Sequence, residues 1–290
     1  MSPHGGKVAF SGLFSSIVGY HLNPLKCGVA RFNQQLAQRL SVPVVPHDAD
    51  WGDRPLLSLK WAEIDDSGRR QVLTRAALHS GYSVLWHDAG SRAVDMRARR
   101  VWSAADIGIP SLLPEIEPRH VRLFSFGMAH KVHASRYRRV RELLEAAGKT
   151  WSLRVSVALH EGTDLDEAAL HFDGLADVLG AETVTVLGCL TDAATREELA
   201  RADVVCAFFD GGARANNTSL HAAMQAWRPV LTNLDDASPD WMLPGNTVMD
   251  LRTLRRWPSM GEWRQVAARG GLVSARRYSW DAVLRRLHGA

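Results

Sequence analysis

Short apolar runs alternate with stretches of helical periodicity along most of the chain. Residues 28–40 place an apolar side chain on one helical face at positions 29, 32, 36 and 40. The apolar runs at 7–12 and 42–46 predict buried strands on either side of this helix, and a loop with Gly19, Pro24 and Gly28 follows the first run. A strand, a glycine-containing loop, a helix and a second strand begin a βαβ unit, which predicts a parallel sheet.

The same alternation continues to about residue 233. Residues 50–80 show a less regular pattern, apart from a helix that we expect near 68–79. Further strands are predicted at 82–88, 121–127, 153–162, 183–188, 204–209 and 229–233, and further helices at 134–147, 165–179, 192–201 and 217–227. The fold class is therefore α/β, with two consecutive Rossmann-like domains.

A proline-rich stretch marks the expected boundary between these domains. Residues 110–118, PSLLPEIEP, carry three prolines in nine positions, a density that breaks helices. We therefore expect a first domain over 1–118 and a second over 119–270. A C-terminal helix over 271–290 is expected to pack back on the first domain.

Composition places the chain among ordinary globular proteins. Of its 290 residues, 46% are hydrophobic and 23% charged, and no apolar run approaches the roughly 20 residues of a membrane span. The amino terminus lacks a charged lead followed by a long apolar stretch, so a cytoplasmic location is expected. The three cysteines show no C-x-x-C spacing, which argues against a zinc site or a disulfide framework.

The basic charge points to phosphate-bearing partners without selecting one. The formal net charge is +4, and only five of the 35 basic residues are lysine. Such a field attracts phosphates on a nucleotide, an anionic membrane or a nucleic acid. Nucleic-acid binding would rest on charge alone, because no readout motif is present, so no nucleic-acid partner is expected.

Several segments, in order along the chain, resemble nucleotide-sugar glycosyltransferases of the GT-B type, group 1. Residues 203–233, DVVCAFFDGGARANNTSLHAAMQAWRPVLTN, are similar to the donor-binding stretch of that family. Supporting similarities lie at 25–40 (LKCGVARFNQQLAQRL), 84–88 (VLWHD), 124–131 (FSFGMAHK) and 276–287 (RRYSWDAVLRRL). The resemblance implies two Rossmann-like domains facing across a cleft, with the donor on the second domain and the acceptor on the first.

The resemblance also implies roles for particular residues. His87, Asp88 and Lys131 are the expected catalytic groups, with His87 and Asp88 facing the transferred sugar or the acceptor. The expected donor-binding residues are Gly28, Gly127, Lys131, His160, Glu161, Asp210, Gly211, Gly212, Asn216, Asn217, Thr218, Ser219 and His221. Residues 216–219 begin a helix, whose free N–H groups and dipole favour a diphosphate.

Each of these assignments has a structural alternative. Asn216 to Ser219 are also common helix-capping residues, and Lys131 is also consistent with a solvated loop lysine. The basic helix with Arg136, Arg138, Arg139 and Arg141 fits a solvated face or a peripheral contact with a membrane. Asp48-x-Asp50 matches a manganese-binding pattern, although it is short and no second cluster completes a metal site, so no metal is expected.

The chain departs from the family at positions that matter for chemistry. Ala213 and His221 stand where many retaining members carry two glutamates, and Met128 replaces a common arginine. We therefore expect a metal-independent hexosyltransferase that needs no cofactor besides its nucleotide-sugar co-substrate. Its acceptor would be a sugar, a natural product or a lipid-linked or polysaccharide chain. The alternative is a non-catalytic protein that binds a sugar nucleotide or a partner on a degenerate GT-B scaffold.

Overall fold

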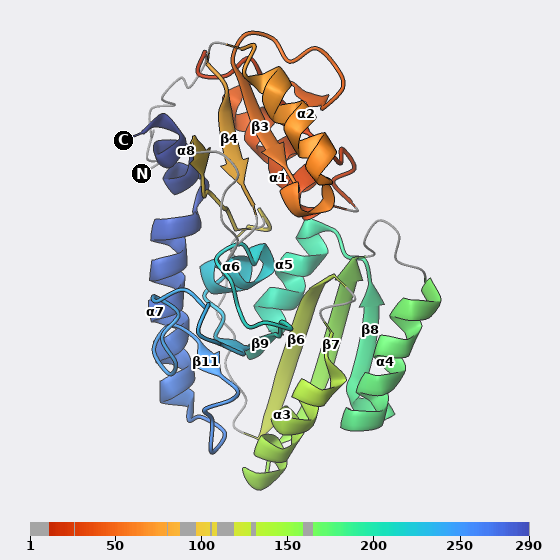
Figure 1. Ribbon diagram of the computed structural model, residues 1–290. Coiled ribbons are helices and arrows are strands. Elements are labelled where there is room, and N and C mark those ends of the chain that lie inside the picture. The colour runs from red at the N-terminus through yellow and green to blue at the C-terminus, as the bar shows by residue number, and fades with distance from the viewer. Residues whose placement is uncertain are drawn as a thin grey trace. The chain divides into compact units, whose positions relative to one another are not determined.

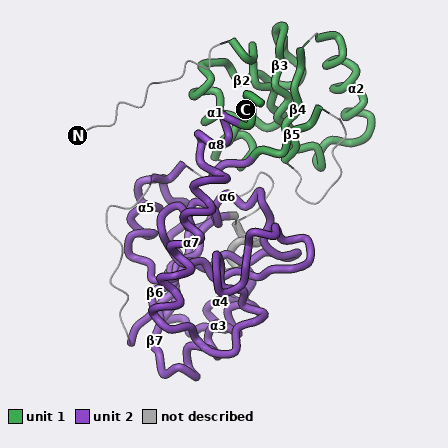
Figure 2. The backbone as a smooth tube through the Cα atoms, turned by 90° about the vertical axis from the view of Figure 1, so that its left-hand side faces the viewer, with its two compact units in different colours: residues 1–101, 286–290 green, residues 102–285 purple. Residues whose placement is uncertain are grey.

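The structure, a computed structural model, describes residues 12–25, 27–79, 81–87, 97–104, 106–108, 119–128, 132–158 and 165–289. Its contacts divide the chain into two compact units, residues 1–101 with 286–290 and residues 102–285 (Figure 2). The sequence analysis placed these divisions at 118 and 270, and the proline-rich stretch 110–118 lies outside the described residues.

The first unit holds a parallel five-stranded sheet in the order β2-β1-β3-β4-β5. Its first and third strands, β1 (Ser16–Gly19) and β3 (Pro55–Leu59), are buried at every position, as expected for parallel strands covered on both faces. The other elements are β2 (Val44–Pro46), β4 (Ser83–Trp86), β5 (Ala98–Arg99), helices α1 (Gly28–Leu40) and α2 (Asp66–Ala76), and a 3₁₀ turn at Trp61–Glu63.

Three strands of this unit, β1, β3 and β5, were missed in the sequence. The expected strand over 7–12 falls almost entirely outside the described residues, whereas β1 lies within the segment that we had assigned to a loop. The strand β3 begins at Pro55 in the irregular region 50–80. A proline is tolerated at the first position of a strand, so it starts β3 here without interrupting the ladder.

The second unit holds a parallel six-stranded sheet in the order β11-β10-β9-β6-β7-β8 (Figure 1). Read from β8, this is the 3-2-1-4-5-6 order of Rossmann folds. The strands are β6 (His120–Met128), β7 (Thr150–Ala158), β8 (Val184–Gly188), β9 (Val204–Ala207), β10 (Val230–Thr232) and β11 (Met249–Asp250). The helices are α3 (Ala134–Ala146), α4 (Leu165–Leu179), α5 (Asp192–Arg201), α6 (Thr218–Gln225) and α7 (Met260–Tyr278), with a 3₁₀ turn at Ala181–Thr183. The last helix, α8 (Trp280–His288), begins in this unit and ends in the first.

Helices cover both faces of this second sheet. Alternate strand residues enter different hydrophobic clusters, with Leu123 in one and Phe124 in the other. The cluster around Leu123 includes side chains of α3, α4 and the start of α7, and the cluster around Phe124 includes those of α5 and α6. The alternation follows from the two-residue period of a strand, and it buries both faces as a parallel sheet requires.

The prediction of two Rossmann-like α/β units is confirmed, and one expected helix is corrected. We expected a single C-terminal helix over 271–290, but α7 begins at Met260 and ends at Tyr278, and α8 begins at Trp280. Ser279 separates them because its backbone is extended and its hydroxyl accepts a hydrogen bond from the Ala282 N–H at 3.3 Å. Residues 286–290 group with the first unit, where the Arg99 guanidinium donates to the Leu287 carbonyl at 2.6 Å.

Candidate functional site

The second unit has a small pocket at the carboxyl ends of β6 and β9. These strands are neighbours in the sheet, and the order of strands reverses between them. Ligands of open α/β sheets bind at such a switch point, just beyond the carboxyl ends of the strands. The pocket is lined by Ser125, Phe126, Gly127, Val132, Ala207, Phe208, Phe209 and Ser219.

Two of the predicted donor-binding residues, Gly127 and Ser219, meet in this pocket. Gly127 has a φ of +147°, a conformation that side-chain-bearing residues rarely adopt, and a Cβ placed on it would lie 3.8 Å from Ser219 Oγ. Glycine therefore allows β6 to end in this conformation next to the first turn of α6. Ser125, which lines the pocket, is hydrogen-bonded to the buried Tyr137 hydroxyl, and burial raises the pKa of Tyr137.

The first turn of α6 is not capped by a side chain. Asn217 occupies the N-cap position, but its Oδ1 accepts a hydrogen bond from the Arg214 backbone N–H at 2.6 Å instead of from the helix. This arrangement differs from the ordinary capping that we considered for residues 216–219. The N–H groups of the first turn and the positive end of the helix dipole are thus available to an anion in the pocket.

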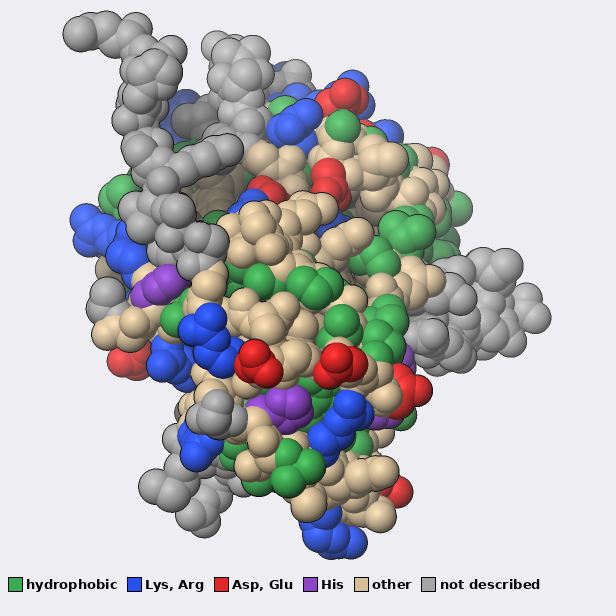
Figure 3. All heavy atoms as spheres, turned by 90° about the horizontal axis from the view of Figure 1, so that it is seen from above, with side chains coloured by type: hydrophobic (Ala, Val, Ile, Leu, Met, Phe, Trp, Pro, Cys, Tyr) green, Lys and Arg blue, Asp and Glu red, His purple; other side chains and the backbone are tan. Residues whose placement is uncertain are grey.

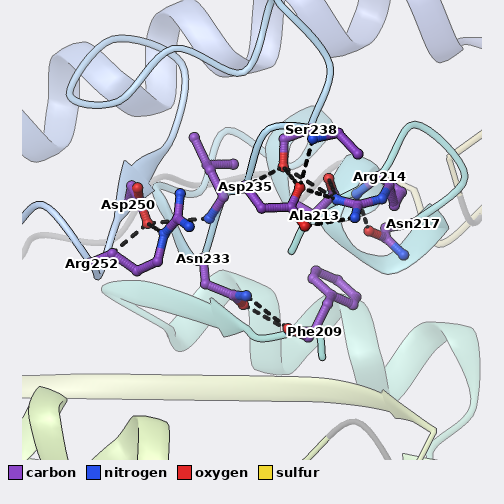
Figure 4. A network of polar contacts seen from close by, with 11 residues as sticks. Phe209, Ala213, Arg214, Asn217, Asn233, Asp235, Ser238, Asp250 and Arg252 are labelled. Carbon is purple, nitrogen blue, oxygen red and sulfur yellow. Dashed lines mark hydrogen bonds and ion pairs between the residues drawn. The ribbon is translucent and has the colours of Figure 1, made fainter. Parts of the chain in front are cut away.

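The loop that joins β9 to α6 is held in place by Asn233 at the end of β10 (Figure 4). Asn233 Nδ2 donates to the Phe209 carbonyl at 2.7 Å, and the Phe209 N–H donates to Asn233 Oδ1 at 2.8 Å. The Ala213 N–H donates to the Asn233 carbonyl at 2.8 Å. Because Asn233 is almost fully buried, these bonds fix the path of the chain into α6.

The glycine pair that we expected to admit a ligand packs against the protein itself. Gly212 has a φ of +83°, and a Cβ there would lie 2.8 Å from the carboxyl carbon of Asp235. Asp235 in turn forms a two-point ion pair with Arg214, at 2.6 and 2.7 Å, and this contact lowers the pKa of Asp235 (Figure 4). Gly211 lies beside the same pair, with a Cβ position 3.3 Å from the Arg214 guanidinium.

Arg214 is a cation near α6 that the sequence analysis did not single out. It precedes the N-cap by three residues, and its own backbone N–H binds the N-cap side chain. Arginine is too common in this chain, with 30 residues, for residue type alone to single out Arg214. Its place between the glycine pair and the helix start is a signal that the sequence analysis did not use. Asp210, at the start of the same loop, is exposed and lies 3.3 Å from Nε2 of His133, the residue before α3.

In the first unit, His87 follows β4 at the carboxyl edge of the sheet. Its side chain is 7% exposed, and burial lowers its pKa to about 4, so the ring is neutral at physiological pH. Nε2 is hydrogen-bonded to Ser58 Oγ at 2.8 Å, and the ring packs edge-on against Phe32. Gly28, the other predicted residue of this unit that the structure describes, is the first residue of α1, and apart from its own helix and chain neighbours no described atom lies within 4 Å of its Cβ position.

Solved structures with a similar arrangement of strands and helices include glycosyltransferases. HepE from Anabaena, solved with UDP and glucose, matches with a TM-score of 0.64 at 9% identity, over 95% of this chain and 98% of that one. A glycosyltransferase from Rickettsia africae matches with a TM-score of 0.59 at 7% identity, over 95% and 97% of the two chains. The galactosyltransferase WaaB matches with a TM-score of 0.51 at 10% identity, over 94% and 98%.

The chain has the GT-B fold. The similarity extends over nearly its whole length and confirms the resemblance drawn from the motifs at the level of fold. The sequence itself matches no protein-family model and no curated protein.

Within the GT-B fold, both positions that replace the family's glutamates are buried. Ala213 and His221 have no exposed surface. The His221 ring stacks on Tyr278 with centroids 3.8 Å apart, Nε2 donates to the Ala215 carbonyl at 2.9 Å, and Nδ1 has no partner among the described residues. Burial lowers the pKa of His221 to about 4. The ring thus packs as a neutral core group and offers no surface to a sugar in this unit.

Four predicted site residues lie outside the described part of the chain: Asp88, Lys131, His160 and Glu161. Lys131 directly precedes Val132, which lines the pocket. Of the predicted donor-binding residues that the structure describes, Gly127 and Ser219 line the pocket, and Asn217 is the N-cap of α6. Thr218 opens α6, and Asn216 precedes its N-cap.

The described residues contain no group of three or more His, Cys, Asp or Glu side chains placed to hold a metal ion. Asp50, of the Asp48-x-Asp50 pair, accepts a hydrogen bond from the Gly52 N–H at 3.1 Å and so stabilises a local turn. No helix among the residues described is long and apolar enough to cross a bilayer.

Arginines of α3 are partly neutralised by acidic neighbours on the same helix. Arg139 pairs with Glu142 at 2.9 Å, and Arg141 pairs with Glu145 at 2.8 Å. On the face shown in Figure 3, basic and acidic side chains are interspersed and do not form one basic surface. The ion pairs of α3 favour a solvated face for that helix.

Proposed function

We propose that this protein is a glycosyltransferase that moves a hexose from a nucleoside-diphosphate sugar to a small-molecule, lipid-linked or polysaccharide acceptor. The observation that carries the proposal is the pocket between the ends of β6 and β9, with the uncapped first turn of α6 at its side. A nucleoside diphosphate is the anion that this arrangement suits best on a GT-B fold.

The chemistry of sugar transfer explains why the anion site matters. Negative charge grows on the departing diphosphate as the glycosidic bond breaks, and fixed donors at that place lower the barrier. The first-turn N–H groups of α6 and the Ser219 hydroxyl would supply these donors, and Lys131 would add a point charge. Because these groups can neutralise the diphosphate, the proposed reaction needs no divalent metal.

The solved structure of HepE with UDP and glucose supports a nucleotide sugar as the donor. The base and ribose would contact the loops that contain His160, Glu161 and Asp210. His87 and Asp88, after β4 of the first unit, would face the transferred sugar or the acceptor.

A second function has one specific observation in its favour. Ala213 and His221 replace the glutamates of retaining GT-B enzymes, and both side chains are fully buried. A protein that binds a sugar nucleotide or a partner without turning it over would tolerate this loss. In this alternative the pocket still binds an anion, but no sugar is transferred.

Turnover of nucleotide sugars separates the two functions. Purified protein would be incubated with UDP-, GDP- and TDP-hexoses and candidate acceptors, and release of free nucleoside diphosphate would be measured. We expect release with one donor, and loss of turnover but retained diphosphate binding in His87→Ala. His79→Ala, which replaces a half-buried histidine of the same unit whose ring stacks on Trp51, is the control. Binding of a sugar nucleotide without release would support the non-catalytic protein.

A further inference from the structure

The loop that follows β1 exposes three large apolar side chains. Tyr20 is 37% exposed, Leu22 47% and Leu25 76%. Of the seven large hydrophobic side chains that are exposed in the described part of the chain, these three lie within the six positions 20–25. A single exposed leucine needs no explanation, but such a cluster is typical of a binding surface. We call residues 20–25 the apolar loop.

Hydrogen bonds hold the apolar loop in a defined shape. Asn23 Oδ1 accepts a hydrogen bond from the Leu25 N–H at 3.0 Å, and the Asn23 carbonyl accepts one from the Cys27 N–H at 3.1 Å. Leu22 lies against the end of β1, since a Cβ on Gly19 would be 3.2 Å from Leu22 Cδ2. The apolar side chains are therefore presented by an ordered turn, which lowers the entropic cost of binding.

The apolar loop lies where the order of strands in the first sheet reverses. From β1 the chain crosses to β2 on one side, and the next strand, β3, pairs with β1 on the other side. Ligands of open α/β sheets bind beyond the carboxyl ends of the strands at such a point. The loop after β3 adjoins the apolar loop here, because His21 Nε2 donates to Glu63 Oε2 at 2.6 Å. The apolar side chains thus lie at the edge of the first unit where a ligand is expected.

The charge of the first unit indicates which kind of ligand suits this surface. Residues 1–101 and 286–290 contain 14 basic and 8 acidic residues, a net charge of +6. Residues 102–285 contain 21 basic and 23 acidic residues, a net charge of −2. The basic excess of the protein therefore belongs to the first unit, and its field attracts anions. A ligand with an apolar chain and an anionic head group matches both features of this unit.

We propose that the apolar loop binds the hydrocarbon chain of an amphiphilic acceptor with an anionic head group. The proposal rests on the proposed function, and of the acceptor classes named there it selects the lipid-linked one. An alkyl chain gains free energy for each CH₂ group that leaves water against Tyr20, Leu22 and Leu25, whereas a polysaccharide has no such chain to bury.

Alkyl phosphates of different chain length test the surface without an activity assay. Butyl, octyl and dodecyl phosphate would be titrated below their micelle-forming concentrations into the unmodified protein and into the double variant Leu22→Ser/Leu25→Ser. We expect the affinity of the unmodified protein to rise at least about tenfold from butyl to dodecyl phosphate. In the double variant the affinity should be nearly independent of chain length, and Leu25→Ser alone should lose part of the dependence.

Leu78→Ser is the matched control. Leu78 is 84% exposed in the same unit but lies outside the apolar loop, so this variant should keep the full dependence on chain length. Absence of the dependence in the unmodified protein, or the same dependence in the double variant, would overturn the proposal. A loss in Leu78→Ser as large as in Leu25→Ser would also overturn it, because the chain would then adhere to any exposed leucine.

Two further measurements separate the head group from the chain and a single acceptor from a membrane. Dodecyl glucoside carries the same chain without a charge and should bind more weakly than dodecyl phosphate at low salt. Equal affinities would overturn the anionic head group. Sedimentation of the protein with phosphatidylglycerol vesicles, without binding of monomeric dodecyl phosphate, would make the apolar loop a membrane contact and overturn its role in acceptor binding.

Kinetics connect the apolar loop to the reaction. With a nucleotide sugar and an acceptor that are turned over, dodecyl phosphate should raise the KM for the acceptor and leave the KM for the nucleotide sugar unchanged. This inhibition should be lost in the double variant. A raised KM for the nucleotide sugar instead would place the chain at the donor site and overturn the proposal. If no nucleotide sugar is turned over, the proposed function fails, while the alkyl phosphate titrations still decide whether the apolar loop binds a hydrocarbon chain.

Discussion

Adding one methyl group at Gly270 should destabilise the second unit and weaken its anion site. Gly270 lies in α7 where that helix packs against α6, and a Cβ there would lie 2.5 Å from the Thr247 carbonyl oxygen and 3.0 Å from Met224 Cε. The first contact is with backbone, which cannot move aside as a side chain would. Gly270→Ala therefore forces α7 away from its neighbours.

The magnitude follows from two opposing effects. Overpacking of a tight core costs about 1–3 kcal/mol, and the backbone contact places Gly270→Ala near the upper end. Alanine gains about 1 kcal/mol of helix propensity over glycine. We expect a net loss of about 2 kcal/mol in the free energy of unfolding. Since Met224 belongs to α6, the displacement should also reduce the affinity for nucleoside diphosphates.

Urea unfolding followed by circular dichroism measures this change, with Gly261→Ala as the matched control. Gly261 is exposed in the same helix, and the nearest atom to its Cβ position is Ser259 Oγ at 4.0 Å. This substitution should stabilise the protein by about 0.5 kcal/mol. The two substitutions should thus change stability in opposite directions. If Gly270→Ala were as stable as Gly261→Ala, the close packing of α7 on α6 would be refuted.

Three further results are expected. Lys131→Ala should reduce diphosphate affinity more than Lys149→Ala, and equal effects in calorimetry would make Lys131 an ordinary surface charge. Stability should fall between pH 6.5 and 4, because burial lowers the pKa of His221 from 6.5 to about 4 and the unfolded chain binds the extra proton. His221 should account for roughly 2–3 kcal/mol of the loss at pH 4.5, so the loss should be smaller by that amount in His221→Phe when unfolding is compared at pH 7 and 4.5. Any turnover should survive EDTA and Asp50→Asn, whereas loss in chelator with rescue by manganese would contradict the metal-independent mechanism.

The α/β architecture was predictable wherever a segment was long and periodic. Helices 165–179 and 192–201 follow the sequence pattern from end to end. The short strands β1 and β11 carry four and two residues, too few for a two-residue period to stand out from a loop. A strand of this length is formed by pairing with neighbours that the sequence does not identify.

The site was predictable in its location and less so in its contacts. The capping-type residues 216–219 and Gly127 indicated where the pocket lies. A helix start and a strand end depend on a few neighbouring residues, so both can be recognised in the sequence. The partner of Gly212 was not predictable, because Asp235 reaches it from a distant loop. His221 looked like a polar site residue in the sequence, yet Tyr278, 57 residues further on, buries its ring.

The most direct test of the central claim is a calorimetric titration of UDP, GDP and TDP into the unmodified protein and into Ser219→Leu. Ser219 lines the pocket at the first turn of α6, so leucine there should fill the space without removing a charge. We predict that one diphosphate binds the unmodified protein and that Ser219→Leu weakens this binding by at least about tenfold, or 1.4 kcal/mol. Absence of binding by every diphosphate at millimolar concentration, or equal affinity in the variant, would contradict a nucleotide site between β6 and β9.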